Sequence, residues 1–283
     1  MTNTIIEKAP AKINLGLFIL NKRSDGYHNV CSLFYPLINF YDTIEISLSS
    51  TPSLYVPNHP ELENESNLVW KAYNLLKQDF DLPSISIILN KNIPYQAGLG
   101  GGSSDAIATI KAINKLFDLE LTKDKLLHYA NSLGSDCAFF IDCKPSIVKG
   151  RGDIINFIDL SLQDYLIVVF LPIFKGKLIH VSTAEAYNLI NTNQDREDME
   201  SIINNHPIDE WANYLKNDFL DIFIQKYPFV NEFINTLYDN GALYVNLSGS
   251  GSAIFAIYDK KSERPIGSPT ISKFSKIIYQ GDL

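Results

Sequence analysis

The run that decides the fold is Pro94-Tyr95-Gln96-Ala97-Gly98-Leu99-Gly100-Gly101-Gly102-Ser103-Ser104-Asp105, in which four of five consecutive positions are glycine. Apolar residues with the period of a helix follow it, at positions 106, 110, 113 and 117. A glycine loop that leads into a helix presents unpaired N–H groups and a positive dipole end, and both favour an anion. Glycine also lets the backbone approach a phosphate closely. We therefore predict a phosphate-binding loop, the alternative being a flexible turn capped by Ser103 or Ser104.

The loop fits neither of the two common nucleotide-binding fingerprints. A P-loop ends in Gly-Lys-Ser/Thr, whereas Gly102 is followed directly by Ser103. The dinucleotide fingerprint spaces its glycines and places an acidic residue about twenty positions further on, at the end of a strand. Glu120 has nearly that spacing but follows the predicted helix. The sequence therefore indicates a third kind of phosphate loop.

The composition is that of an ordinary globular protein, with 46% hydrophobic and 20% charged residues in 283. A net charge of −8 argues against a surface for nucleic acid or for an anionic membrane. No apolar run reaches the ~18–20 residues of a membrane span, and residues 1–4 do not resemble a signal peptide. Cys31, Cys137 and Cys143 lack metal-site spacing. We expect a cytoplasmic protein with reduced thiols, either a monomer or a weak homodimer, whose partner is a small molecule.

Strands and helices alternate along the chain without internal repeats or a long linker. Residues 11–20 alternate apolar and polar side chains and predict a half-buried strand, with Lys12, Asn14 and Gly16 on the polar face. The other predicted strands are 44–48, 84–89, 146–149, 153–158, 165–171, 242–247, 253–258 and 274–280, and the predicted helices are 68–76 (capped by Ser66), 122–132, 182–191, 207–215 and 228–240. Pro265 and Pro269 should interrupt any helix in the tail. We predict an α+β fold with two domains, 1–157 and 158–283.

Three further clusters carry catalytic or binding chemistry, and each has an ordinary structural alternative. Lys12 and Asn14 share one strand face, although an isolated lysine usually faces solvent. Asp136 lies at the start of a predicted helical turn, where an N-cap is the common role of an aspartate. Residues 247–252 read Leu-Ser-Gly-Ser-Gly-Ser between two strands, for which a hairpin turn is the default. Their occurrence together with the glycine loop favours a functional role for all three.

Together these clusters resemble the three motifs of the GHMP kinases, a family named after galacto-, homoserine, mevalonate and phosphomevalonate kinases. Residues 10–17 match the first motif, 94–106 the second and 247–252 the third. The resemblance implies an N-terminal domain similar to ribosomal protein S5 and a ferredoxin-like C-terminal domain. It extends over residues 9–258, whereas the proline-interrupted tail departs from the last helix of a ferredoxin-like domain.

A narrower resemblance is carried by the run Arg23-Ser24-Asp25-Gly26-Tyr27-His28. It is similar to the signature of GHMP kinases that act on 4-diphosphocytidyl-2-C-methyl-D-erythritol. Segments 92–106, 134–136, 150–152, 181–184 and 217–219 match as well, whereas Cys137-Ala138 replaces the apolar residue and proline of many members. The resemblance implies ATP-dependent phosphorylation of the 2-hydroxyl of this substrate, in the non-mevalonate isoprenoid precursor pathway.

The resemblance also implies roles for individual residues. Asp136 would be the general base for the hydroxyl proton, and Lys12 would steady the γ-phosphate. ATP and Mg²⁺ are the implied cofactors, with Ser103 or Ser104 on phosphate or metal and the ion held largely by ATP and water. The implied ATP-binding residues are Asn67, Pro94, Tyr95, Gln96, Ala97, Gly98, Leu99, Gly100, Gly101, Gly102, Ser103 and Ser104. The implied substrate-binding residues are Asn14, Tyr27, His28, Thr183 and Tyr187.

Recognition of cytidine is the most specific part of this hypothesis. Tyr27 would stack on the cytosine ring, His28 would hydrogen-bond its polar edge, and Tyr187 would cover the other face. Without the resemblance, Tyr27 and His28 are better interpreted as a surface turn. Two rival functions remain, another GHMP kinase of the homoserine or mevalonate type and a nucleotide-binding sensor without catalysis. The Tyr27-His28 signature argues against the first, and the presence of both Lys12 and Asp136 argues against the second.

Overall fold

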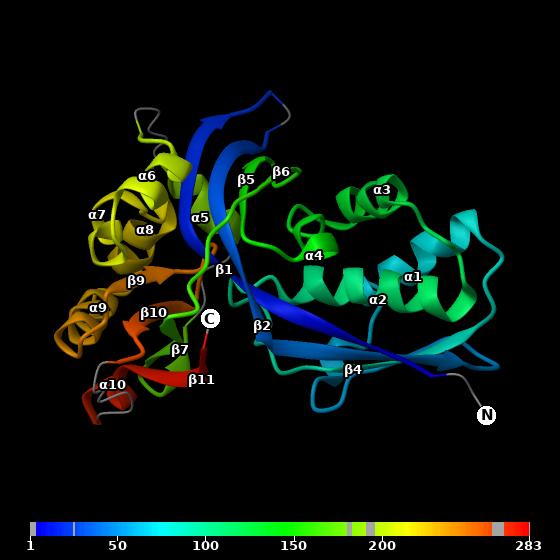
Figure 1. The fold of residues 1–283 in the computed structure, drawn as a ribbon. Coiled ribbons are helices and arrows are strands. Elements are labelled where there is room, and N and C mark those ends of the chain that lie inside the picture. The colour runs from blue at the N-terminus through cyan, green and yellow to red at the C-terminus, as the bar shows by residue number, and fades with distance from the viewer. Residues whose placement is uncertain (1–3, 25, 180–182, 191–195, 262–268, 283) are drawn as a thin grey trace. The chain divides into compact units, whose positions relative to one another are not determined.

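A computed structural model describes residues 4–24, 26–179, 183–190, 196–261 and 269–282, which form two compact units. Unit 1 consists of Met1–Lys12, Pro36–Tyr95 and Gly100–Lys144, and unit 2 consists of Ile13–Tyr35, Gln96–Leu99 and Pro145–Leu283. The glycine loop and the two long paired strands, β1 (Ile5–Lys22) and β2 (His28–Leu48), contribute residues to both units. Figure 1 shows the order of the elements along the chain. The domain boundary near residue 157 stays a prediction.

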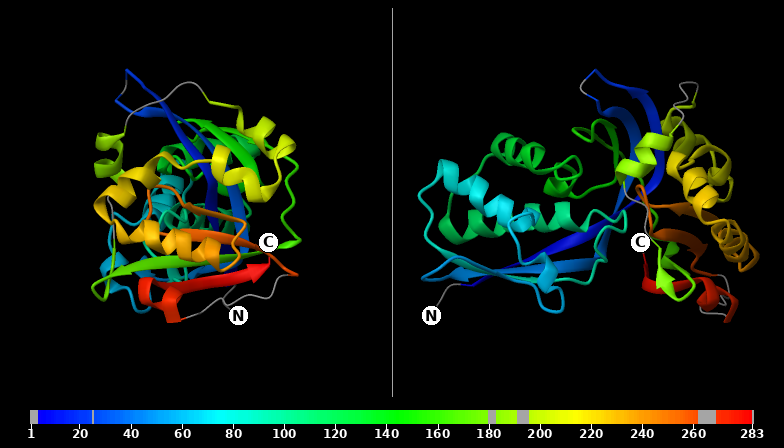
Figure 2. Two further views of the ribbon diagram at one scale, coloured as in Figure 1. Left: turned by 90° about the vertical axis from the view of Figure 1, so that its left-hand side faces the viewer. Right: turned by 180° about the vertical axis from the view of Figure 1, so that it is seen from behind.

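Unit 1 is a layer of strands covered by helices. Strand β4 pairs with the second part of β2 in antiparallel fashion and with the short β3 in parallel. The helices lie on one face of these strands, as the two opposite views in Figures 1 and 2 show. Ile85, Ile87 and Leu89 of β4 are fully buried and alternate with more exposed residues, as expected for a sheet with one covered face. The elements of unit 1 are β3 (Ser53–Tyr55), η1 (Pro60–Leu62), α1 (Leu68–Asp79), β4 (Ile85–Asn90), α2 (Gly101–Phe117), α3 (Lys123–Leu133) and α4 (Phe139–Asp142).

Unit 2 is built on an antiparallel sheet with the strand order β11-β7-β10-β9. One face carries an apolar core in which Phe170 of β7 meets Phe233 of α9 edge-on, with ring centroids 5.4 Å apart. Strand β5 pairs with the first part of β2 and with β6. The elements of unit 2 are β5 (Ser146–Gly150), β6 (Ile154–Phe157), β7 (Tyr165–Phe174), β8 (Lys177–Leu178), α5 (Thr183–Leu189), α6 (Met199–Asn205), η2 (Ile208–Glu210), α7 (Trp211–Tyr214), α8 (Asp218–Lys226), α9 (Phe229–Asp239), β9 (Tyr244–Leu247), β10 (Ile254–Asp259), α10 (Pro269–Phe274) and β11 (Ser275–Asp282).

Most predicted elements are present, two predictions about helices are wrong, and two helices were not predicted. Asn67, and not Ser66, caps α1, because the Asn67 Oδ1 accepts the Val69 N–H at 3.0 Å. A short helix, α10, begins at Pro269, since proline is tolerated in the first turn of a helix. Helices α6 and α8 were not predicted. Phe219 and Phe223 of α8 are buried in the core of unit 2. Within the described ranges, no helix is long and apolar enough to cross a membrane.

The prediction of a half-buried first strand is also wrong. Strand β1 is buried on both faces between Ala11 and Ile19, and Lys12 and Asn14 are almost completely inaccessible. In unit 2 the polar face of β1 is covered from Gly16 onward, where an added Cβ would lie 3.2 Å from Leu215 and 3.3 Å from Met199. The polar residues on this face are therefore in the interior, where they need hydrogen-bond partners.

Candidate active site

Helix α2 begins directly in the glycine loop, as the sequence predicts. Gly100 is its N-cap and has a left-handed backbone, with φ of 71° and ψ of 11°. Ser104 N–H donates to Gly100 O at 3.0 Å. The N–H groups of Gly101 to Ser103 therefore precede the helical hydrogen-bond ladder and lie at the positive end of the helix dipole. This arrangement supplies the donors that a phosphate group requires.

The start of α2 lies against Lys12, which is ion-paired with Asp136. A Cβ at Gly100 would be 2.8 Å from Phe140 Cζ and 3.0 Å from Lys12 Cγ, so only glycine fits there. The aliphatic part of Lys12 thus packs against the N-cap, and its Nζ lies 3.2 Å from Asp136 Oδ2. The Lys12 side chain is 3% exposed, whereas that of Asp136 is 32% exposed. Unit 1 therefore brings both predicted catalytic residues close to the start of α2, where the sequence predicts phosphate binding.

The turn at 135–138 between α3 and α4 carries Asp136. The N-cap alternative for Asp136 is wrong, because α4 is capped by Ala138 without a side-chain hydrogen bond. Helix α4 is fixed to α2 by Lys111, whose Nζ donates to the carbonyl oxygens of Phe140 and Ile141 at 2.9 Å each. The carboxylate of Asp136 is thus held beside Lys12 by a braced turn and remains partly accessible.

The third predicted motif contacts the glycine loop within unit 2. It connects the antiparallel strands β9 and β10, so the hairpin interpretation is correct for its backbone. Ser248 Oγ donates to Gly98 O at 2.9 Å, and Ala253 N–H donates to Ala97 O at 3.0 Å. Gly98 has φ of +80°, and a Cβ there would overlap the carbonyl oxygen of Ser248. The hairpin loop therefore supports the glycine loop by direct backbone contact.

Asn14 is a buried part of the same support. Its backbone N–H donates to Ser248 Oγ at 3.3 Å, and its Nδ2 donates to Ser32 Oγ at 2.8 Å. Ser32 Oγ in turn donates to Gly16 O at 2.6 Å. The predicted role of Asn14 in substrate binding stays a prediction, while its contacts in this structure are with strands β1 and β2 and the hairpin loop.

Asn217 was matched by the family resemblance, but no role was predicted for it. Its Nδ2 donates to the carbonyl oxygens of Leu247 and Gly249, at 2.7 and 2.9 Å, so it fixes the hairpin loop from the other side. Its Oδ1 accepts the Phe219 N–H at 3.0 Å and caps α8. The sequence signal for Asn217 was that of an N-cap before a helix, which does not reveal the second function of the amide.

The residues predicted to recognise cytidine lie in unit 2. The His28 ring stacks on Tyr187 with centroids 5.2 Å apart and an interplanar angle of 23°, and Tyr187 meets Phe219 edge-on. Tyr27 is 58% exposed, and the guanidinium of Arg151 lies 5.2 Å from its ring centroid. The structure thus pairs His28 with Tyr187, whereas the prediction placed Tyr27 and Tyr187 on opposite faces of a base. Only the backbone of Thr183 is described, at the start of α5, and Asp25 of the signature lies outside the described residues.

The remaining predicted nucleotide-binding residues differ in accessibility. Asn67 uses its side chain internally, since its Nδ2 donates to Leu62 O at 2.9 Å while its Oδ1 caps α1. Tyr95 is exposed, as is Gln96, whereas Ala97 and Leu99 are buried and Pro94 is intermediate. Ser104 Oγ is buried with no hydrogen-bond partner among the described residues, and Ser103 is the more accessible of the two serines.

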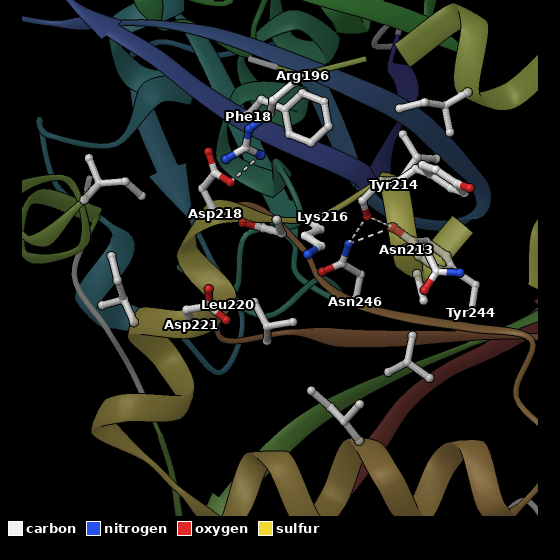
Figure 3. A pocket seen from close by; sticks show the side chains of 18 of the residues that line it. Phe18, Arg196, Asn213, Tyr214, Lys216, Asp218, Leu220, Asp221, Tyr244 and Asn246 are labelled. Carbon is white, nitrogen blue, oxygen red and sulfur yellow. Dashed lines mark hydrogen bonds and ion pairs between the residues drawn. The ribbon is translucent and has the colours of Figure 1, made fainter. Parts of the chain in front are cut away.

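A pocket of about 740 Å³ in unit 2 contains none of the predicted site residues. Figure 3 shows Arg196 directed at Asp218, with 2.6 Å between Nη1 and Oδ1, and stacked on Phe18. Asn246 Nδ2, on the other side of the pocket, donates to Leu215 O at 3.0 Å. These polar groups are thus paired with one another, and the pocket mixes both signs of charge.

Comparison with protein families identifies the chain. The family model described as the GHMP kinases N terminal domain matches residues 67–144, and the one described as GHMP kinases C terminal matches residues 193–267. The chain belongs to the GHMP kinase family. The chain is a small-molecule kinase with the two-domain fold of this family.

Three curated relatives of this GHMP kinase share one name. The 4-diphosphocytidyl-2-C-methyl-D-erythritol kinase of Azobacteroides pseudotrichonymphae is 43% identical over 91% of this chain and 94% of its own. The kinase of the same name from Bacteroides fragilis is 43% identical over 89% of this chain and 92% of its own. The kinase of that name from Chlorobaculum tepidum is 35% identical over 90% of both chains.

Solved structures of kinases have the same fold as this chain. A crystal structure of 4-(cytidine 5'-diphospho)-2C-methyl-D-erythritol kinase superposes with a TM-score of 0.77 at 27% identity, covering 98% of each chain. The mevalonate kinase of Methanococcus jannaschii gives a TM-score of 0.68 at 14% identity over 100% of this chain and 99% of its own. At that identity the second likeness shows the fold alone.

Proposed function

We propose that the chain transfers the γ-phosphate of ATP to the 2-hydroxyl of 4-diphosphocytidyl-2-C-methyl-D-erythritol. For the substrate, the supporting observation is the set of curated kinases with that substrate in their names, at 35–43% identity over about nine-tenths of the chain. For the reaction, it is the Lys12–Asp136 pair at the start of α2. The proposal also places the chain in isoprenoid precursor synthesis, in the cytoplasm.

Phosphoryl transfer requires positioning, neutralisation of the phosphate charge and an acceptor for the hydroxyl proton. The N–H groups of Gly101 to Ser103 would bind the β- and γ-phosphates, since they lie at the positive end of α2. Asp136, ion-paired and partly exposed, would accept the proton of the attacking hydroxyl. Lys12 would stabilise the charge that develops on the γ-phosphate in the transition state.

Mg²⁺ would enter with ATP and supply charge neutralisation between the phosphates. In the described part of the chain no group of three or more His, Cys, Asp or Glu side chains is placed to hold a metal ion. The donors at the start of α2 are backbone N–H groups and serine hydroxyls, of which Ser103 is the accessible one. This set fits an ion that is held mainly by phosphate oxygens and water, because Mg²⁺ sites commonly take few ligands from the protein.

Cytidine recognition would use Tyr27 and His28 of unit 2. Tyr27 has an exposed ring on which a base can stack. The guanidinium of Arg151 lies over that ring in the structure, so a base would have to displace Arg151 in order to stack there. His28 would hydrogen-bond the edge of the base while Tyr187 fixes its ring plane. A site built this way rejects substrates that leave its polar groups unpaired.

A parallel assay tests the proposal. The purified chain is incubated with Mg²⁺, ATP and one of four acceptors, namely the cytidyl substrate, homoserine, mevalonate or galactose. ADP release is measured, and the products are identified by mass spectrometry. We expect phosphorylation of the cytidyl substrate alone. Activity on another acceptor in its place would refute the substrate, and ATP binding without any transfer would favour a nucleotide sensor.

A further inference from the structure

Three ionisable side chains are buried together beneath the start of α2, and none of them is Lys12 or Asp136. Lys91 Nζ lies 2.5 Å from Asp42 Oδ2 and 2.7 Å from Asp105 Oδ2. The three side chains are 4%, 0% and 3% exposed, respectively. All three belong to unit 1. Sequence reasoning gave them no role, because an isolated Lys or Asp is normally interpreted as a surface residue.

The cluster joins the two ends of the glycine loop. Lys91 directly follows β4, and Asp105 lies in the second turn of α2, so the Lys91–Asp105 bond closes the segment that contains the whole loop. At the start of that segment, Asp42 Oδ1 accepts the N–H groups of Asn92 and Ile93, at 2.5 and 2.8 Å. At its end, a Cβ on Gly101 would lie 3.3 Å from Lys91 Nζ, so the ammonium lies directly under the first residue of α2.

Stability alone is a poor explanation for this cluster. Burying charges has a large desolvation cost, and replacing such groups with apolar ones is often neutral or stabilising. Here one lysine serves two carboxylates, and Asp105 Oδ1 is buried without a hydrogen-bond partner among the described residues. Burial and the neighbouring Asp42 raise the pKa of Asp105 to about 8, against the opposing effect of Lys91. The cluster instead fixes the positions of backbone segments, since each of its charge-assisted hydrogen bonds holds one segment in place.

We propose that Asp42, Lys91 and Asp105 are positioning residues that hold the two ends of the glycine loop in the geometry that binds the phosphates of ATP. This inference rests on the proposed function for its nucleotide. The N–H groups of the loop bind phosphate only when they converge, and convergence requires that residues 91–93 and 101–105 keep a fixed separation. A shift of one of these segments would misalign the N–H donors and weaken their hydrogen bonds to phosphate.

Asp105→Leu tests this proposal against a purely electrostatic role. Removing Asp105 takes away a negative or a neutral group, so by charge alone ATP binding stays the same or improves. Loss of the tether predicts the opposite, a KM for ATP raised at least about tenfold, which corresponds to the loss of one hydrogen bond to a charged phosphate. Asp105→Asn keeps an oxygen that accepts from Lys91 and should remain within about threefold of the parent protein. Lys91→Met removes both bonds and should raise the KM for ATP at least as much as Asp105→Leu does.

The readouts separate positioning from general damage. We expect the KM for the cytidyl substrate to change less than twofold and kcat to fall much less than the affinity for ATP does. The matched control is Lys115→Met. Lys115 lies further along α2 and forms an ion pair with Glu7 of β1, and its replacement should leave the KM for ATP and kcat unchanged. ATP dissociation constants from calorimetry test the inference even if the chain phosphorylates none of the acceptors. A folded Asp105→Leu protein with unchanged or tighter ATP binding would overturn it, as would equal effects on both substrates.

Discussion

The contact between Gly98 and the hairpin loop allows a quantitative prediction about Gly98→Ala. At φ of +80° an alanine pays roughly 1–2 kcal/mol for the left-handed conformation. Its Cβ would overlap Ser248 O and lie 2.9 Å from Ser248 C and 3.2 Å from Gly251 O, all of them backbone atoms. Because backbone must move to make room, overpacking adds about 1–3 kcal/mol. We expect a total destabilisation of about 2–5 kcal/mol.

Gly241→Ala isolates the conformational part of this cost. Gly241 has φ of +86°, and nothing lies within 4 Å of an added Cβ. Both variants gain the same entropy advantage in the unfolded chain, which therefore cancels in the comparison. The difference between them should equal the packing contribution of about 1–3 kcal/mol, or roughly 2–10 °C in Tm. Thermal unfolding followed by circular dichroism measures it.

Gly102→Ala gives the complementary result. Gly102 lies in the first turn of α2 with no positive φ, and an added Cβ would meet only Leu68, at 3.8 Å. Alanine should therefore leave the Tm unchanged or raise it slightly. Its methyl group would nevertheless hinder the close approach of phosphate and raise the KM for ATP.

One outcome would contradict the prediction for Gly98→Ala. If Gly98→Ala matches Gly241→Ala in both Tm and KM for ATP, the reasoning that the hairpin loop supports the glycine loop is wrong.

Four further predictions concern the chemistry. Asp136→Asn should lower kcat by about 10²–10⁴ with little change in the KM for ATP, and retention of half the parent kcat would exclude the general base. Lys12→Met should lower kcat by about 10²–10³ in steady-state assays while the Tm stays close to that of the parent, since methionine keeps the apolar contact with the N-cap; normal turnover would contradict this role. Tyr27→Ala should raise the KM for the cytidyl substrate about tenfold and leave that for ATP unchanged, because stacking on a base contributes ~1–3 kcal/mol. Burial raises the pKa of Cys137 to about 12 and of Cys143 to about 11. Thiolate is the reactive form, so alkylation of the native protein at pH 8 should be slow and accelerate as the pH rises, and rapid labelling seen by mass spectrometry would argue against the burial.

The elements that were predicted correctly are those with a local signal. The glycine run and the period of 106–117 indicate α2, and Thr122 indicates the start of α3, because caps and amphipathic spacing depend only on neighbours in sequence. Strand β2 was predicted only over its last residues, 44–48. Between Val30 and Leu37 every residue of β2 is buried, so the strand has no alternation for a sequence pattern to reveal.

In the candidate site, too, only the features with a local sequence signal could be predicted from the residues. The start of a helix at the glycine loop could be predicted from its residues alone, whereas the pairing of Lys12 with Asp136 joins a strand and a turn that are far apart in the chain. Only the family resemblance connected these two residues. The Lys91 cluster was missed for a related reason, since its members come from β2, the end of β4 and α2, and no local pattern marks a buried charge.

Strand β1 shows why the polar face of a predicted strand should not be equated with a solvent-facing one. Its alternation was read correctly, and Lys12 and Asn14 do share a face opposite Ile13 and Leu15. That face is buried because each polar group has found a partner there: Lys12 has Asp136, and Asn14 has Ser32. Buried polar groups without partners are costly, so a polar face enters the interior only where such partners are supplied. In β1 the alternation therefore separates an apolar face from a polar face whose side chains are paired in the interior.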